Sequence, residues 1–408
     1  MIKLPFSFEN EVFENLNILF DTLGAPDKDV RIVGGSIRNL FIGLPVSDID
    51  LATPDPPDLV VKRLNSEGIK NISIGASYGT IKAIMGLRNY DITTLRRDTE
   101  CDGRYAKVEF TNDWYEDAKR RDFTFNALSM RPDGTIFDYF NGRDHIKSRL
   151  VRFIGNPEKR IKEDYLRILR YFRFIALLNG QEDIVSVTAA KCMAHGLSKI
   201  SRERIREELI KILNINDPCK SIKLMIRNNI FDKIFGSEFK VLSLDDLITN
   251  EKNLGHSIDT NSWYSRFVTL FGKSALEISR NLKCSKKDQI MIEKIMCAGE
   301  EVSKSLDKPK CYHFFHKFGQ SASISGVLIA IAREKENLNS SLKSLYALFS
   351  SLREVNFPIK GEDIISLGIT EGPKIGKILK DLEMHWIDSG FTDSKETLLK
   401  KTGSAVIS

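Results

Sequence analysis

Two acidic residues separated by one position, Asp48 and Asp50, follow a glycine pair and an arginine at Gly34, Gly35 and Arg38. Side chains at positions i and i+2 of a strand point to the same face, so the two carboxylates are expected to project together. Such hard oxygen ligands bind Mg²⁺ beside substrate phosphates. Glycines leave backbone N–H groups open to a triphosphate, and arginine adds a permanently charged, planar donor. Together these residues predict a nucleotidyl-transfer site, whereas either half alone is typical of an exposed acid pair or an ordinary turn.

A second candidate group lies at residues 120–126, which we expect to continue a helix that begins near Trp114. Two arginines, Arg120 and Arg121, lie there beside Asp122 and Asn126. This group could bind the phosphates and the ribose hydroxyls of a nucleotide, because it combines guanidinium donors with carboxylate and amide groups. The alternative is an exposed helix face on which charges three positions apart form ion pairs. Both interpretations of this segment stay open.

A third candidate group occupies residues 163–173, where the spacing of the apolar residues predicts one amphipathic helix. Asp164, Arg167 and Arg170 recur every three positions and would share a stripe next to the buried side. Aspartate accepts hydrogen bonds and arginine donates them, so the pair could read the edge of a base. Cytosine and adenine present an amino donor next to a ring-nitrogen acceptor, whereas guanine and uracil have the opposite polarity and would leave polar groups unpaired. The alternative is a salt-bridged helix surface.

The elements that must position these groups change in character near residue 157. Before that point, short runs rich in Val, Ile and Thr alternate with turns and favour an α+β head with a small mixed sheet. A dinucleotide-binding fold is disfavoured, because no G-x-G-x-x-G opens a helix after the first strand. The rest of the chain carries long amphipathic segments with little glycine and predicts an all-α region. The predicted strands are 30–33, 48–52, 71–74, 80–85, 89–95 and 107–111, and the predicted helices include 8–23, 57–67, 157–179, 187–194, 201–214 and 218–229.

At 408 residues the chain exceeds one ordinary domain, and we predict a head at 1–150, a helical segment at 151–245, and a helical body and tail at 246–408. The 61 Lys and Arg against 55 Asp and Glu are compatible with a polyanionic partner but do not demand one. Six scattered cysteines without a C-x-x-C pair predict reduced thiols. We expect a cytoplasmic protein without membrane contact, since the first residues lack a signal peptide's apolar core and no run approaches roughly 18 apolar residues. The oligomeric state is left open.

Five motifs give the chain a resemblance to the class II tRNA nucleotidyltransferases, the CCA-adding enzymes and related bacterial poly(A) polymerases. They occur in the order and at the spacing of that family. Residues 195–205 resemble its neck-to-body helix and residues 361–376 its C-terminal tail, so the resemblance covers nearly the whole chain. Asn39 departs from it, since the family usually has Asp there, and Leu95 stands where Phe is common. The five motifs are residues 33–38, 48–50, 91–98, 120–127 and 163–167.

The resemblance implies a polymerase-β-like head followed by a helical neck, body and tail, and an untemplated addition of C, C and A to tRNA 3′ ends from CTP and ATP. Asp48 and Asp50 would hold Mg²⁺, with Asp91 as a third carboxylate. Residues 96–106 align with a flexible loop that is associated with A addition. Alternatives are a poly(A) polymerase, a partial activity adding only CC or A, and a catalytically silent RNA-binding scaffold. The implied nucleotide-binding residues are Gly34, Gly35, Arg38, Arg121, Asp122, Asn126, Asp164, Arg167, Arg170 and Arg173.

Overall fold

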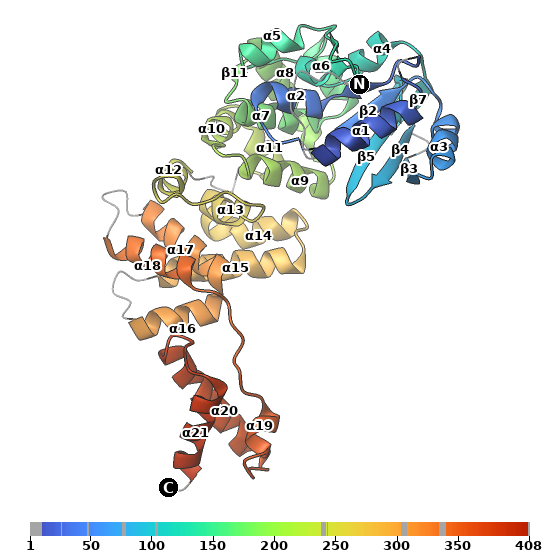
Figure 1. The fold of residues 1–408 in the computed structure, drawn as a ribbon. Coiled ribbons are helices and arrows are strands. Elements are labelled where there is room, and N and C mark those ends of the chain that lie inside the picture. The colour runs from blue at the N-terminus through green and yellow to red at the C-terminus, as the bar shows by residue number, and fades with distance from the viewer. Residues whose placement is uncertain are drawn as a thin grey trace. The chain divides into compact units, whose positions relative to one another are not determined.

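The computed structural model divides the chain into two compact units, Met1–Ser237 and Glu238–Ser408 (Figure 1). The first unit contains a mixed sheet with its helices, and the described residues of the second form helices and connections. The division does not separate residues 1–150 from 151–245, so the three predicted segments stay a prediction. The described residues are 10–25, 27–46, 49–75, 79–102, 105–237, 242, 244–302, 308–333 and 340–406.

A seven-stranded sheet with the order β3-β4-β5-β2-β1-β8-β9 organises the first unit. Strands β2 and β5 pair in parallel, and the other described neighbours pair antiparallel, which confirms the predicted mixed sheet. The predicted strands agree with the observed ones to within two residues, whereas the short β8 and β9 were not predicted. The strands are β1 (Arg31–Val33), β2 (Ile49–Thr53), β3 (Lys70–Gly75), β4 (Thr80–Met85), β5 (Arg88–Thr94), β8 (Ser129–Met130) and β9 (Ile136–Phe137).

Strand β5 has one buried face and carries polar side chains on the other. On β5 the buried Tyr90 and Ile92 alternate with the partly exposed Asp91 and Thr93, as expected for a strand covered on one side. Helices α1 (Asn10–Thr22) and α3 (Pro57–Ser66) pack beside the strands, and Asn15 of α1 donates a hydrogen bond to the Tyr90 hydroxyl at 3.1 Å (Figure 1). The acids of β2 and β5 therefore lie on the face opposite to the one that α1 covers.

The glycine pair after β1 begins a helix that the sequence did not predict, α2 (Gly35–Ile42). Gly34 has a φ of 72°, a left-handed conformation that glycine adopts without the strain of a side chain. A Cβ at this position would also lie 2.8 Å from Nη1 of Arg121. The backbone turn therefore favours glycine at position 34, and a side chain there would also displace the Arg121 guanidinium.

The helix predicted to run from Trp114 through residue 126 is broken. Helix α4 (Trp114–Lys119) ends first, and Phe123 adopts an extended conformation that bridges Phe153. The fully buried Phe123 ring lies 4.7 Å from the Phe153 ring, and Thr124–Asn126 form a separate 3₁₀ turn. Aromatic burial in the core thus overrides the helical pattern, and Asp122 and Asn126 do not share a helix with Trp114.

The predicted continuous helix over residues 157–179 is also wrong, because it is interrupted at Asp164. Helix α6 (Pro157–Glu163) ends there, and α7 (Arg167–Leu177) follows. Asp164 Oδ1 accepts a hydrogen bond from the backbone N–H of Leu166 at 3.1 Å, a local bond that competes with helical pairing. Asp164 therefore lies in a connection, and the helical stripe predicted for it contains only Arg167 and Arg170.

The stretch that aligns with a flexible loop has paired backbone where the structure describes it. Strands β6 (Arg96–Asp102) and β7 (Tyr105–Phe110) form an antiparallel hairpin of their own, directly after β5. Near its base, Arg97 pairs with Glu109 at 3.0 Å. One residue, Leu95, separates the hairpin from β5, the strand that carries Asp91.

Helices and two short strands complete the first unit after residue 140. The change of pattern near residue 157 predicted the helices that follow it, whereas α5, β10 and β11 were not predicted. The predicted helices at 187–194, 201–214 and 218–229 correspond to α8, α9 and α10. These elements are α5 (Gly142–Lys147), β10 (Leu150–Val151), β11 (Gln181–Glu182), α8 (Ile184–Met193), α9 (Arg202–Leu213), α10 (Cys219–Arg227) and α11 (Ile230–Phe235), with a 3₁₀ segment at Ala194–Lys199.

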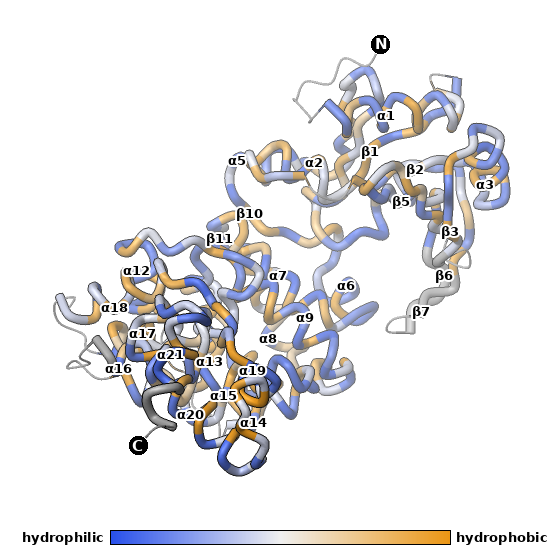
Figure 2. The backbone as a smooth tube through the Cα atoms, turned by 60° about the horizontal axis from the view of Figure 1, so that its bottom comes forward, coloured by the Kyte–Doolittle hydropathy of each residue, from blue (hydrophilic) through white to orange (hydrophobic). Residues whose placement is uncertain are grey.

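The second unit is built from amphipathic helices, and Figure 2 shows hydrophilic and hydrophobic residues alternating along them. Its interior includes an ion pair between fully buried side chains, Arg266 and Glu251, at 2.6 Å. Among the described residues, no helix combines the length and the apolar character needed to cross a membrane. The helices are α12 (Asp245–Asn253), α13 (Trp263–Phe271), α14 (Ala275–Asn281), α15 (Lys286–Glu301), α16 (Lys308–Phe318), α17 (Gln320–Arg333), α18 (Ser340–Ser351), α19 (Gly361–Ile365), α20 (Gly372–Asp388) and α21 (Lys395–Val406), with a 3₁₀ turn at Gly272–Ser274.

Candidate active site

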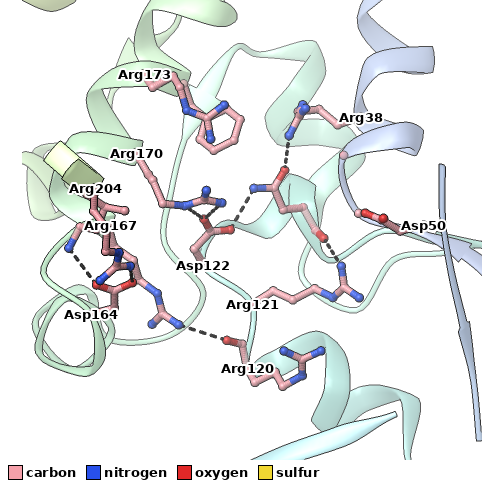
Figure 3. A pocket seen from close by; sticks show the side chains of 15 residues that line it. Arg38, Asp50, Arg120, Arg121, Asp122, Asp164, Arg167, Arg170, Arg173 and Arg204 are labelled. Atoms are coloured by element: carbon pink, nitrogen blue, oxygen red, sulfur yellow. Dashed lines mark hydrogen bonds and ion pairs between the residues drawn. The ribbon is translucent and has the colours of Figure 1, made fainter. Parts of the chain in front are cut away.

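A pocket of about 450 Å³ in the first unit collects most of the predicted site residues (Figure 3). Three carboxylates line it, Asp50, Asp122 and Asp164, together with Gly34, Gly35 and Asn126. The arginines outnumber these acids and leave the lining with an excess of four positive charges. Such a surplus in a concave site favours a polyanionic ligand. The lining arginines are Arg38, Arg120, Arg121, Arg167, Arg170, Arg173 and Arg204.

The carboxylates of the sheet lie on neighbouring parallel strands. Asp50 of β2 and Asp91 of β5 are register partners, so both project from the same face. Asp91 Oδ1 lies 2.6 Å from Nζ of Lys82 on the neighbouring strand β4, which neutralises part of its charge. Asp48 lies outside the described residues. Asp50 is a pocket residue and Asp91 lies beside the pocket, while the pairing of Asp48 with Asp50 stays a prediction.

Arg38 projects from α2 into the pocket, and its guanidinium donates hydrogen bonds to two side-chain amide oxygens. Its Nη1 donates to Asn126 Oδ1 at 2.7 Å, and its Nη2 donates to Asn39 Oδ1 at 2.8 Å. Burial lowers the pKa of Arg38 to about 10, assisted by the nearby charges of Arg173 and Arg170. Asn39, the departure from the family pattern, is thus a neutral partner of Arg38, so that part of the Arg38 charge stays available for an anion.

Asp122 is the buried centre of the pocket wall. Arg170 Nε donates to Asp122 Oδ2 at 2.7 Å, and Asn126 Nδ2 donates to Oδ1 at 2.9 Å (Figure 3). The backbone N–H of Phe123 also donates to Oδ1, at 2.8 Å. Asn126 in turn accepts from Arg38, so Asp122 links α2 to α7 through one chain of hydrogen bonds. The pairing is internal to the pocket, not the exposed ion-pair face that was the alternative.

Asp122 also gives the fold a dependence on acid pH. Burial raises the pKa of its carboxyl, but the charge of Arg170 and the hydrogen bonds from Asn126 and Arg170 outweigh burial and lower that pKa to about 2. A lowered pKa stabilises the folded state above the ordinary value near 4, and this contribution is lost as the pH falls toward 2. Between pH 5 and pH 3 we expect the free energy of unfolding to fall by about 1 kcal/mol more in the wild type than in Asp122→Asn. Urea unfolding at the two pH values measures this difference, and equal losses in both proteins would contradict it.

Asp164 and Arg167 both line the pocket, but each has its own anchor. Arg204 Nη2 of α9 lies 2.7 Å from Asp164 Oδ2. Arg167 Nη1 donates to Glu163 Oε2 at 2.5 Å and to the Arg160 carbonyl at 2.8 Å. The acceptor Asp164 and the donor Arg167 are thus held by different partners at the same wall of the pocket. The predicted pair is brought together at the pocket, although not on one helix.

Arg173 is fixed in a similar way at the next turn of α7. Its Nε is bonded to Oε1 of Glu208, and its guanidinium carbon lies 4.4 Å above the Phe174 ring centre. Glu208 is almost fully buried and belongs to α9. Helix α9 therefore supports two residues of the wall, Asp164 through Arg204 and Arg173 through Glu208.

Sequence reasoning missed Arg204 as a pocket residue, Glu163 as the anchor of Arg167 and Glu208 as the anchor of Arg173. The segment at 201–205 was assigned to a connecting helix without a role in the site. Asp164 and Arg204 are 40 positions apart, and Arg173 and Glu208 are 35 apart. No periodicity predicts contacts over such separations. The only local signal was the positive charge at position 204 itself.

Comparison with known proteins supports the same assignment of the fold. The chain matches the family described as poly A polymerase head domain over residues 30–152, and the family described as probable RNA and SrmB-binding site of polymerase A over residues 185–241. It is 33% identical to CCA tRNA nucleotidyltransferase 1, mitochondrial, of Homo sapiens, over 97% of this chain and 92% of the relative. It is 28% identical to the CCA-adding enzyme of Ligilactobacillus salivarius, over 91% of each chain.

Two solved structures have the same fold. The Bacillus stearothermophilus CCA-adding enzyme in complex with CTP matches with a TM-score of 0.74 at 24% identity, covering 98% of this chain and 99% of the other. The Thermotoga maritima CCA-adding enzyme complexed with tRNA matches with a TM-score of 0.61 at 20% identity, covering 98% and 96%. The fold of the chain, an α+β head followed by helices, is therefore one already seen in solved structures.

Proposed function

The chain belongs to the CCA tRNA nucleotidyltransferase family, and from that premise we propose that it adds CCA to tRNA 3′ ends, using CTP and ATP without a nucleic-acid template. One observation carries the proposal: a single pocket combines a carboxylate of the sheet, Asp50, with seven arginines and a separate acceptor and donor at Asp164 and Arg167. A nucleoside triphosphate presents the matching groups, since it has a polyanionic chain at one end and a hydrogen-bonding base at the other.

The triphosphate is assigned to the end of the pocket nearest the glycine turn. Arg38 of α2 and Arg121 both line this end of the pocket, and Nη1 of Arg121 lies next to Gly34. Guanidinium groups bind phosphate oxygens through paired, charge-assisted hydrogen bonds. Asn126 and Asp122 lie beside them and supply the acceptors and donors for ribose hydroxyls.

The base is assigned to the opposite wall. Asp164 accepts from the amino group and Arg167 donates to the ring nitrogen that cytosine and adenine share. Each is already oriented by an ion pair, Asp164 by Arg204 and Arg167 by Glu163. Uracil and guanine would leave both groups facing a partner of the same polarity, which costs a buried hydrogen bond on each side.

Enzymes of this family use divalent metal ions, and we assign Mg²⁺ to Asp48 and Asp50 with Asp91 alongside. The donor set fits, because carboxylate oxygens on adjacent strands are hard ligands. Bound there, Mg²⁺ supplies activation of the RNA 3′ hydroxyl and stabilisation of the charge on pyrophosphate. The protein's own part is to align the hydroxyl with the α-phosphate for in-line displacement and to hold the triphosphate with arginines.

The acceptor end of tRNA is the proposed macromolecular partner, held through its phosphates. In the second unit, Lys374, Lys377 and Lys380 are exposed on α20, spaced to lie along one face. Helix α20 begins at Gly372, so its first turn presents backbone N–H groups as a second means of contacting phosphate. Binding through such contacts weakens steeply with salt.

We place the protein in the cytosol, which cell fractionation tests against the mitochondrial location that the name of the human relative gives.

The test uses tRNA transcripts that end at the discriminator base, with Mg²⁺ and each nucleoside triphosphate singly and in combination. Products are sized at single-nucleotide resolution. Two additions with CTP, and a third only when ATP is also present, support the proposal. A long adenosine ladder would indicate poly(A) synthesis instead. A stop after two cytidines would indicate a CC-adding enzyme. Addition of a single A, only to transcripts that already end in CC, would indicate an A-adding enzyme. No extension at all would leave a silent RNA-binding scaffold.

A further inference from the structure

Asp117 of α4 is a buried carboxylate that binds two arginines of the pocket without lining it. Its side chain is 4% exposed. Asp117 Oδ1 accepts from Arg120 Nε at 2.8 Å, and Oδ2 accepts from Arg121 Nη2 at 3.2 Å. Both oxygens are therefore engaged, each with a different arginine, and both arginines reach the pocket. Asp117 can influence a ligand only through these partners.

Arg121 is held between Asp117 and the glycine turn. Its Nη1 donates to the Asn126 carbonyl at 3.3 Å, and the same atom lies 2.8 Å from the position that a Cβ on Gly34 would occupy. The guanidinium thus has one edge on Asp117 and the other against the turn that opens α2. A flexible arginine would lose conformational entropy about several rotatable bonds on binding a phosphate. An arginine that is already held in place has lost that entropy before the phosphate binds.

Asp117 also reaches the base of the β6–β7 hairpin. The backbone N–H of Arg96, the first residue of β6, donates to Asp117 Oδ1 at 3.4 Å. The preceding residue, Leu95, belongs to a buried cluster with Trp114 of α4. The same carboxylate therefore touches the point where the strand of Asp91 continues into the hairpin.

The neighbouring arginines keep the Asp117 carboxyl ionised. Burial alone raises the pKa of this carboxyl, but the charges of Arg121 and Arg120 and their hydrogen bonds outweigh burial and lower the pKa. An ionised carboxylate is an acceptor only, so it can serve both arginines and the backbone N–H at once. A neutral residue at this position would leave buried donors without an acceptor.

We propose that Asp117 is a positioning residue for triphosphate binding, which holds Arg121 against the Gly34 turn and joins that arginine to the base of the β6–β7 hairpin. The inference rests on the proposed function, since it assigns the triphosphate to the Arg121 end of the pocket. Asp117 never touches the nucleotide, and its effect is confined to ligands that carry the phosphates.

The experiment compares binding of CTP and of CMP to the full-length protein by titration calorimetry, for the wild type, Asp117→Ala and Asp117→Asn. In Asp117→Ala we expect the Kd for CTP to rise about tenfold and the Kd for CMP to change by less than about twofold. Asp117→Asn should lie between, because its amide keeps one oxygen for Arg120 and the Arg96 N–H. Glu116→Ala is the matched control, since it removes the adjacent acid of α4, which pairs only with Lys119 among the contacts described, at 3.0 Å. Hydrogen exchange at residues 95–97 should become faster in Asp117→Ala alone.

The outcomes separate this inference from the proposed function. If the wild type binds no CTP and extends no tRNA, the proposed function fails before the variants are compared. If the wild type is active but Asp117→Ala and Asp117→Asn weaken CTP and CMP equally, the residue is merely structural and the inference is overturned. Unchanged CTP binding in a folded Asp117→Asn, judged by thermal unfolding, overturns it as well.

Discussion

Replacing Asp50 with asparagine is expected to lower kcat for CTP addition to tRNA by about 10³-fold or more, with little change in thermal stability. Asp50 of β2 is the register partner of Asp91 and lines the pocket to which the triphosphate is assigned. The amide has nearly the same shape as the carboxylate, and strand pairing is made by the backbone. The loss therefore concerns the chemistry and not the fold.

Single-turnover addition of one cytidine, with saturating CTP and tRNA, measures this effect. Asp58→Asn is the control, because it removes one carboxylate from the exposed surface of α3 in the same unit. Titration with Mg²⁺ and then Mn²⁺ adds a second measure, since a variant that has lost a metal ligand needs a higher metal concentration. Near-normal turnover in Asp50→Asn would show that the metal assignment is wrong.

Replacing Arg167 with alanine is expected to reduce both the rate of addition and the preference for CTP over UTP, the preference by about 10²-fold. Discrimination by a hydrogen-bonding site depends on the buried groups that a wrong base leaves unpaired, and Arg167 is one of two such groups. Its side chain is 14% exposed and forms an ion pair with Glu163, so it is ordered before the base arrives. Removing it leaves Asp164, which remains paired with Arg204.

The ratio of kcat/KM for CTP to that for UTP measures this prediction, on the same tRNA transcript. Lys162→Ala is the control, because it removes a positive charge from an exposed position of α6, two residues from the break at Asp164. Arg167→Lys should recover part of the rate but little of the selectivity, since an ammonium keeps the charge and loses the planar fork. If Arg167→Ala is slower yet keeps its selectivity, the base-reading assignment to this residue fails.

The sequence alone determined the parts of this protein that depend on local pattern. Short runs rich in Val, Ile and Thr located strands β1 to β5 and β7 to within two residues, whereas β6 and β8 to β11 were not predicted. The period of two along a strand predicted that acids two positions apart project to the same face. The change to amphipathic helices after residue 157 was also predicted, since it depends on the spacing of apolar residues along short windows. Ordered motifs then pointed to the family before any tertiary contact was known.

The two helix breaks could not be predicted from short windows of sequence. At Asp164 and at Phe123 the pattern stays helical, but a side-chain bond to the backbone in one case and burial against Phe153 in the other win over it. The energies involved are those of single contacts, which exceed the small differences in helix propensity between residues. Tertiary context therefore decided where the pocket walls bend.

Only the tertiary structure decided how the site is held together. Asp50 meets Asp91 because β2 and β5 are parallel neighbours, and Arg204 and Glu208 reach the wall because α9 packs on α7. Asp117 binds Arg121 locally, yet its role depends on Gly34, which lies far away in sequence. Residue types specify which groups can bind a nucleotide, whereas long-range packing specifies which of them are brought to one pocket and which partners keep them in place. Contacts between residues many positions apart leave no periodic signal in a single chain, which is the physical reason for that division.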